Sequence, residues 1–286
     1  MATFFNQASI SFNGFVTNSN VTSGEVLDVL TATKSAISSS YRQGGGVVYA
    51  ISILNSGAVP ISGITVTDDL GSYTATSGEV TPLDYTQDSV RLYVNGTLVA
   101  SPTVTVGPPL VFSGITIPAG GVALILYEAS ANAYAPLASG ATISNTATVE
   151  ATAPCVEGPI TASASVGAAD FTSLSIAKSV CPDAVSSCEE ITYTFVIQNA
   201  GNTPVVATDN LTVSDTFAPA LSNITVTLDG APLTEGVGYT YDEATGVFAT
   251  LPGQITVPAA TFVQDPVTGI VTTTPGTTVL TVSGTV

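Results

Sequence analysis

The chain has 286 residues but only two lysines, and both lie at the same place in an internal repeat. Lys34 stands in LTATKSA and Lys178 in LSIAKSV, 144 positions later. A lysine that is desolvated in such an apolar strand either pairs with a carboxylate or loses its proton and becomes a nucleophile. Each copy offers one carboxylate at an equivalent segment end, Asp68 in ITVTDDLG and Asp215 in LTVSDTFA. Each copy thus holds a candidate lysine–aspartate site, although an unrelated placement of the two residues stays open.

Two copies of one β-domain position these residues. Tyr49 in VVYAISILNSG and Tyr193 in ITYTFVIQNAG keep the same spacing of 144. Short Thr/Val/Ile alternations recur between Gly, Pro, Asn and Asp, which is typical of strands and turns in a β-sandwich. Charged residues make up only 9% of the chain, far below the usual quarter. The sequence therefore predicts an all-β fold of two tandem immunoglobulin-like β-sandwiches.

The two copies differ at their ends. Copy one includes ISNTATV (143–149), whereas copy two stops at GTTVLTVSGTV without a counterpart. The missing segment recurs at the front of the chain as FFNQASI (4–10), which places Asn6 on Asn145. We therefore expect the second sandwich to lack its last strand and the N-terminus to be a donor strand. Its candidate donor residues are Phe4, Phe5, Ala8, Ile10 and Phe12.

This comparison of the two copies predicts five segments. They are a donor strand (1–13), a linker (14–26), a first β-sandwich (27–151), a second linker (152–170) and a second, incomplete β-sandwich (171–286). Because the two linker-like stretches repeat each other, their continuation as strands is an alternative to flexible tethers.

A sandwich without its last strand has an unpaired edge that can pair with a strand from another chain. Insertion of the N-terminal strand into the next copy is a head-to-tail contact that propagates as a fibre unless a ring closes. Insertion into the same chain gives a closed monomer, and local pairing of a frayed strand is a third option. We favour the fibre, with the chain itself as its partner.

The motifs carry a family resemblance. The runs VVYAISILNSG, ITYTFVIQNAG, LTVSDTF and ISNTATV resemble the bacterial surface-protein repeat known as domain of unknown function eleven. The resemblance covers most of the chain and implies immunoglobulin-like or Cna-B-like sandwiches in wall proteins and filaments. The two-copy arrangement is also similar to proteins of clostridial spore appendages, by analogy alone.

Sandwiches of the Cna-like kind form an amide between a strand lysine and an asparagine on the closing strand, helped by a buried acid. The resemblance thus implies two isopeptide sets, Lys34, Asp68 and Asn145 within the chain, and Lys178, Asp215 and Asn6 of a neighbouring subunit. A Lys–Asp ion pair with no amide is an equally good interpretation.

Three cysteines and two aspartate-containing pairs complete the candidate residues. Cys181 and Cys188 are close enough in sequence to close a small disulfide loop, and Cys155 is left for another chain or as a free thiol. Asp68–Asp69 and Asp209–Asn210 are more typical of turns than of calcium sites. We expect no metal site and no cofactor.

The formal net charge of −17 argues against partners that carry negative charge. Binding to nucleic acid or to an anionic membrane is not expected. The absence of histidine removes the commonest general base, so an enzyme is not expected either. No signal-peptide pattern stands in MATFFNQAS. We therefore expect an extracellular or spore surface location, with release from a mother-cell cytosol as one route.

The sequence thus predicts a structural subunit of a self-assembling extracellular filament or spore appendage. Other surface or spore-coat proteins are further candidate partners. The alternative is a surface adhesin or ligand-binding β-sandwich protein that uses its loops.

Overall fold

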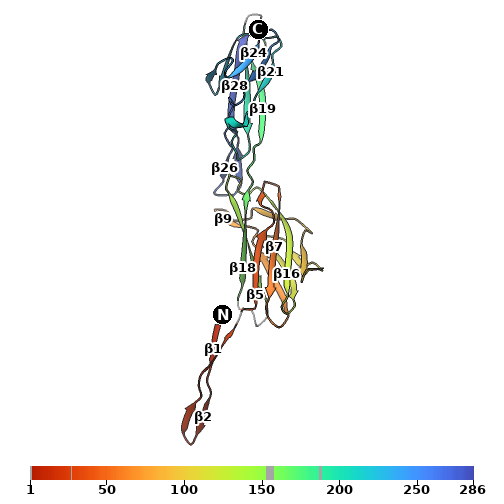
Figure 1. Cartoon of the computed structure of the whole chain (residues 1–286), viewed down its shortest axis with the longest axis vertical. Coiled ribbons are helices and arrows are strands. Elements are labelled where there is room, and N and C mark those ends of the chain that lie inside the picture. The colour runs from red at the N-terminus through yellow and green to blue at the C-terminus, as the bar shows by residue number, and fades with distance from the viewer. Residues whose placement is uncertain (1, 27, 153–157, 187–188) are drawn as a thin grey trace. The chain divides into compact units, whose positions relative to one another are not determined.

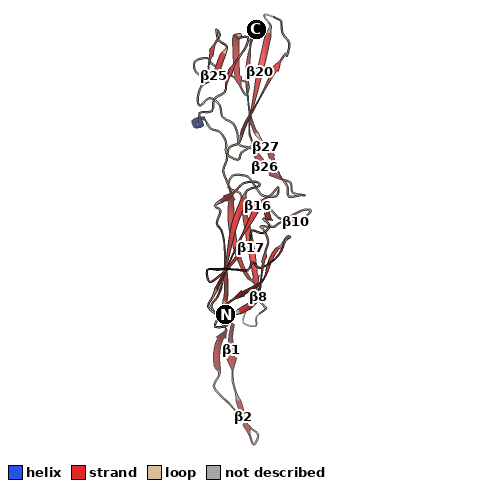
Figure 2. Ribbon diagram, turned by 90° about the vertical axis from the view of Figure 1, so that its right-hand side faces the viewer, coloured by secondary structure: helices blue, strands red, loops and turns tan. Residues whose placement is uncertain are grey.

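Strands make up nearly all regular structure in the computed structural model, which describes residues 2–26, 28–152, 158–186 and 189–286 (Figures 1 and 2). The one helix among these residues is a short 3-10 turn, η1 (Ala207–Asp209). The chain divides into two units, the first formed mainly by residues 1–74, 79–132 and 143–166, the second mainly by residues 167–286. This architecture confirms the predicted all-β fold with two tandem sandwiches.

Unit 1 contains two six-stranded sheets. The first runs in the order β13 (Thr97–Val99), β12 (Arg91–Val94), β16 (Val122–Ala131), β7 (Gly46–Asn55) and β5 (Leu30–Ala36), with β11 (Leu83–Tyr85) also on β16. The second runs β14 (Thr103–Thr105), β15 (Leu110–Ile117), β8 (Ile61–Asp68), β17 (Thr142–Glu150), β18 (Ile160–Ala168) and β6 (Ser40–Tyr41). A small extra sheet pairs β9 (Tyr73–Ala75) with β10 (Gly78–Val80).

The period-two pattern of the sequence decides which side chains enter the core. Along β7, Val47, Tyr49, Ile51 and Ile53 are fully buried, and the residues between them are only partly covered. Because successive strand residues point to opposite faces, Lys34 of β5 and Tyr127 of β16 lie on this same inner face. Tyr127 is paired with Tyr49 in the ladder, and their rings stack at 5.5 Å.

Unit 2 repeats the first sheet but not all of the second. Its larger sheet runs β19 (Leu174–Cys181), β20 (Glu190–Asn199), β28 (Gly276–Thr285), β22 (Ser222–Leu228) and β23 (Ala231–Leu233). Its smaller sheet runs β21 (Ser214–Thr216), β25 (Val247–Thr250) and β24 (Tyr239–Asp242). A separate hairpin joins β26 (Thr261–Gln264) to β27 (Val271–Thr274), around a turn at residues 265–269.

The edge of the smaller sheet is where the two units differ. In unit 1, β8 lies between β15 and β17, and β17 is followed by β18. In unit 2, β21 corresponds to the end of β8 and pairs with β25 on one side, and no described strand of the unit pairs with its other side. Among its described strands, the second sandwich thus shows no counterpart of the strand that closes the first.

The N-terminal residues 2–26 form a two-stranded ribbon, here called the N-terminal ribbon. β1 (Ala2–Asn6) pairs with β4 (Thr22–Val26), and β2 (Ser9–Phe12) pairs with β3 (Phe15–Asn18). The turn is Asn13–Gly14, both with positive φ, and this dipeptide favours a type I′ hairpin. Residues 14–26, expected to act as a linker, thus supply two strands, and residues 160–168 of the second expected linker form β18.

Candidate functional site

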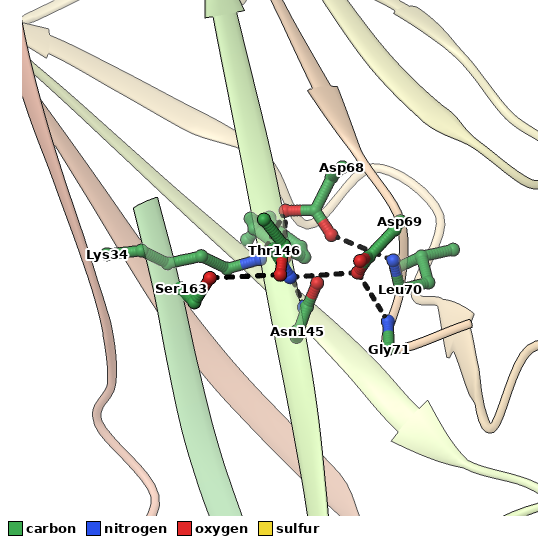
Figure 3. A network of polar contacts seen from close by, with 9 residues as sticks. Lys34, Asp68, Asp69, Leu70, Gly71, Asn145, Thr146 and Ser163 are labelled. Atoms are coloured by element: carbon green, nitrogen blue, oxygen red, sulfur yellow. Dashed lines mark hydrogen bonds and ion pairs between the residues drawn. The ribbon is translucent and has the colours of Figure 1, made fainter. Parts of the chain in front are cut away.

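The predicted lysine and aspartate of unit 1 meet in the interior of the sandwich. Lys34 lies on the inner face of β5, and Asp68 is the last residue of β8. The Lys34 Nζ and Asp68 Oδ2 atoms are 2.7 Å apart, and neither side chain is exposed. Figure 3 shows the lysine side chain extending toward the aspartate and the asparagine of β17.

A tyrosine that sequence reasoning did not single out joins this pair to Asn145. The Tyr127 hydroxyl donates to Asp68 Oδ2 at 2.7 Å, and it accepts from Asn145 Nδ2 at 3.0 Å. Asn145 is fully buried on β17, and its Oδ1 atom accepts no hydrogen bond from the described residues. All three predicted residues of unit 1 are thus in one network, with Tyr127 as a fourth member.

Backbone contacts hold the carboxylate and the asparagine strand in register. The Leu70 N–H donates to Asp68 Oδ1 at 3.1 Å. Asp69 Oδ1 accepts from the Gly71 and Thr146 N–H groups, each at 2.8 Å. Since Thr146 follows Asn145 on β17, this contact fixes the position of the asparagine relative to the end of β8. The Asp68–Asp69 pair therefore orders a turn, which is the use that the sequence favoured.

Burial controls the protonation of the groups around Lys34. Desolvation lowers the pKa of Lys34, and the attraction of Asp68 opposes this effect only in part. Burial raises the pKa of Tyr127 well above its usual value, and the neighbouring Asp68 charge adds to this shift. The Lys34 ammonium lies 5.0 Å from the centre of the Tyr49 ring. The site thus combines a lysine whose pKa is lowered, a carboxyl group and a buried side-chain amide.

These three groups are the components of amide transfer. An unprotonated amine is a nucleophile, a carboxyl group can carry protons, and an amide carbonyl is the electrophile. Water is excluded because Asp68 and Asn145 are fully buried. A stable ion pair uses the same geometry without any bond being made.

The equivalent pair in unit 2 is formed but open to solvent. Lys178 on β19 makes an ion pair with Asp215 on β21. The Lys178 side chain is 40% exposed, whereas that of Lys34 is fully buried. The Lys178 ammonium lies 4.5 Å from the centre of the Tyr193 ring. The ladder partner of Tyr193 on β28 is Val282, so unit 2 has a valine where unit 1 has Tyr127.

The inner face of β19 is uncovered around this pair. Every residue of β19 is exposed, including Leu174, Ile176 and Val180. The corresponding strand β5 instead alternates, with Leu30 and Lys34 buried. In unit 1, Ile160 at the start of β18 lines one pocket with Leu30 and Ala32 of β5. Strands β17 and β18 thus belong to a layer that has no counterpart among the described strands of unit 2.

The predicted donor residues lie in the N-terminal ribbon and are exposed. Phe4 and Phe5 are 56% and 71% exposed, and Ile10 and Phe12 are 72% and 76% exposed. Asn6 is exposed in β1, where its backbone pairs with Thr22. Asn6 belongs to unit 1, whereas Lys178 and Asp215 belong to unit 2.

The remaining candidate residues are the three cysteines and Asp209. Cys181 is exposed at the end of β19, and Cys155 and Cys188 lie outside the described residues. Asp209 accepts from the Val206 N–H at 2.8 Å and so caps the 3-10 turn. Within the described part of the chain, no helix has the length and apolar character needed to cross a membrane.

Comparisons with known proteins give weak structural likenesses. No family model matches the chain, and no curated protein matches it, so the resemblance read from the motifs stays a prediction. The major pilin subunit BcpA of Bacillus cereus has a TM-score of 0.38 at 15% identity, over 87% of this chain and 65% of that chain. A 35 kDa C-terminal fragment of the major pilin GBS80 of Streptococcus agalactiae has a TM-score of 0.37 at 11% identity, over 87% of this chain and 91% of that chain.

A third solved structure is the full-length major pilin SpaD from Corynebacterium diphtheriae, with a TM-score of 0.37 at 11% identity. The match covers 77% of this chain but only 50% of SpaD, so the chain spans half of that protein. Likeness of this degree does not assign a function, which has to be argued from the chain's own residues.

Proposed function

We propose that this protein is the structural subunit of a self-assembling filament on the extracellular or spore surface. In this proposal, the N-terminal segment of one subunit adds to the open edge of β21 in unit 2 of the next subunit. The contact is heterologous, so it propagates head to tail. Copies of the chain itself are the main partner, and other surface or spore-coat proteins are further candidates.

One observation carries the proposal, namely that unit 1 contains the closing strand that unit 2 lacks. Residues 147–150 of β17 pair with β8 from Asp68 back to Thr65. The sequence of β17 recurs in the N-terminal segment, with Asn6 and Ala8 in place of Asn145 and Ala147. An unpaired strand edge is a ready acceptor for such a strand. The same alignment pairs Ala8 with Asp215.

The proposal extends to two amide bonds. Burial lowers the pKa of Lys34, which favours the amine that can attack the Asn145 side-chain carbonyl. The Nζ–Cγ bond forms, the Cγ–Nδ2 bond of the asparagine breaks, and ammonia leaves with a proton relayed from the amine by the Asp68 carboxyl group. In unit 2, Lys178 and Asp215 would act in the same way on the neighbouring subunit's Asn6. The second bond would join subunits covalently.

Removal of residues 2–12 tests the assembly proposal. The truncated chain is expected to stay in the supernatant under conditions in which the full chain pellets as filaments visible by electron microscopy. Its unit 2 should also exchange amide hydrogens faster than unit 2 of the assembled protein, because β19 and β21 would remain uncovered. Filaments formed by the truncated chain would show that the N-terminus is not the donor.

A matched control is Ser9→Asp, on the face of β2 opposite to Ile10. This change adds a charge without altering the apolar row, so filaments should still form. A full chain that remains monomeric in all conditions would favour the adhesin alternative.

A further inference from the structure

We infer that the element donated to unit 2 is the whole N-terminal ribbon, two strands wide, and not the first strand alone. This inference rests on the proposed assembly and specifies its donor. In unit 1, the sheet continues beyond β8 by two strands, β17 and then β18, before it reaches β6. A single added strand would supply the counterpart of β17 only.

The two strands of the ribbon bring together the sequence counterparts of β17 and β18. Thr146 and Ser163 contact each other through their hydroxyl oxygens at 2.9 Å. Their sequence counterparts are Gln7 and Ser19, and Gln7 Nε2 donates to the Ser19 carbonyl at 2.8 Å. The Ala8 N–H donates to Ser19 Oγ at 2.9 Å, and the Ser19 N–H donates to the Ala8 carbonyl at 2.8 Å. The ribbon therefore already pairs the counterparts of β17 and β18 as antiparallel strands, with Ser19 opposite Ala8 and so one residue away from the register of Thr146 and Ser163.

Compared with the β17–β18 pair, the ribbon has a larger side chain on one strand and a smaller residue opposite it on the other. The Thr146–Ser163 contact, together with the Ala168 N–H bond to the Ala141 carbonyl, places Ile143 opposite Val166, and both are buried. In the ribbon, the counterpart of Ile143 is the larger Phe4, and it lies opposite Gly24. A Cβ atom at position 24 would meet the Phe4 ring. The pair thus keeps a similar total size with the bulk moved to one strand, as expected of two strands that are buried together.

The acceptor has uncovered apolar surface. In unit 2, Leu174, Ile176 and Val180 of β19 are 43%, 56% and 39% exposed. In unit 1, the buried residues of β18 include Ala162, Ala164 and Val166. A two-stranded donor can cover both the edge of β21 and the inner face of β19, whereas a two-stranded ribbon left in water is marginally stable. A second copy of the chain is therefore the occupant that fits this surface.

Substitution of Gly24 tests whether the second strand is donated. In Gly24→Val, the new side chain meets the Phe4 ring, which can swing aside in the free ribbon but not between the packed layers of unit 2. If the whole ribbon inserts, we expect the yield of pelletable filaments to fall about tenfold or more. The double variant Phe4→Ile/Gly24→Val recreates the Ile143–Val166 pair and should restore the yield.

Ser23→Val is the matched control, because Ser23 lies on the other face of the same strand. It should assemble like the unmodified chain. If Gly24→Val also assembles normally or faster, or if the double variant is no better than Gly24→Val, the ribbon is not the donor. Such a result leaves the single donor strand intact, because that proposal fails only if the chain without residues 2–12 still polymerises.

Discussion

The Tyr127 hydroxyl lies between the Asp68 carboxyl group and the amide of Asn145, and it is hydrogen-bonded to both. It shares Asp68 Oδ2 with the Lys34 ammonium. Unit 2 has Val282 at the equivalent ladder position, so the neighbouring subunit's Asn6 would have no such hydroxyl there. The two candidate sites therefore have the same lysine and aspartate but a different environment for the asparagine.

Tyr127→Phe should destabilise unit 1. The change leaves the buried Asn145 Nδ2 without its acceptor and removes one donor from Asp68, which should cost about 1–3 kcal/mol of unfolding free energy. Urea denaturation of the full chain, read by amide hydrogen exchange in β16 and β17, measures the loss. The control is Tyr93→Phe, because Tyr93 lies beside the buried Leu92 on β12 and is only partly covered. Equal stability of both variants would mean that the hydroxyl network contributes nothing.

The two lysines should differ in their contribution to the stability of the unassembled chain. Lys34→Met leaves the Asp68 carboxylate buried and without its cation, at a cost of about 3–5 kcal/mol. Lys178→Met removes a pair whose lysine is 40% exposed, and it should cost less than about 1 kcal/mol.

Both costs are measured by urea unfolding of chains whose intact mass shows no loss of ammonia. The double variant Lys34→Met/Asp68→Leu should recover most of the loss, because an apolar pair replaces an isolated charge. A small effect of Lys34→Met alone would contradict the buried ion pair.

The stability contributed by Lys34 should rise with pH. Its pKa in the folded state is lowered, so the unfolded chain binds more protons between that value and 10.5, and unfolding becomes harder as the pH increases through this window. The difference in unfolding free energy between the wild-type chain without amide cross-links and Lys34→Met should therefore grow toward pH 10.5 and then level off.

The difference between these two proteins is the useful quantity, because the tyrosines titrate in both. Burial raises the pKa of Tyr41 to about 12 and also raises those of Tyr49 and Tyr127, so the stability of each protein alone should fall above pH 10. A difference that stays constant from pH 7 to 10.5 would show that Lys34 titrates alike in both states.

Protease digests of reduced filaments should contain two cross-linked peptides, each lighter by one ammonia. One would join Lys34 to Asn145, and the other would join Lys178 to Asn6. In filaments made from mixed isotopic forms of the chain, the second peptide should contain both labels. Lys178→Ala should still assemble but should lose resistance to boiling in detergent. Filaments that resist detergent despite this change would point to the cysteines instead.

The fold followed from local features of the sequence, but one member of the unit 1 network did not. The 144-residue repeat, the Thr/Val/Ile alternation and the missing ISNTATV segment were enough to predict two sandwiches with the second incomplete. The resemblance to Cna-like sandwiches brought Lys34, Asp68 and Asn145 into consideration together. Tyr127 was missed because its inward direction depends on pairing with Tyr49, far away in the sequence.

The N-terminal ribbon could have been anticipated from one dipeptide. Asn13–Gly14, between two alternating segments, is a strong signal for a tight hairpin. The prediction instead treated residues 14–26 as a linker-like stretch, because they are rich in Ser, Thr, Asn and Gly. The burial of Lys34 and the exposure of Lys178 depend on which layers are present, and no local pattern contains that information.

The inward ion pairs also determine how filaments of this chain would behave toward one another. Lys34 and Lys178 are half of the four basic residues, against 21 acidic ones. With both lysines turned toward aspartates, Arg42 and Arg91 are the only other basic side chains to offset an acidic exterior. Neighbouring filaments would repel each other over about 30 Å at 0.01 M salt but only about 10 Å at 0.1 M. The ionic strength of the surroundings, and not the strand exchange, would then decide whether filaments stay single or form bundles.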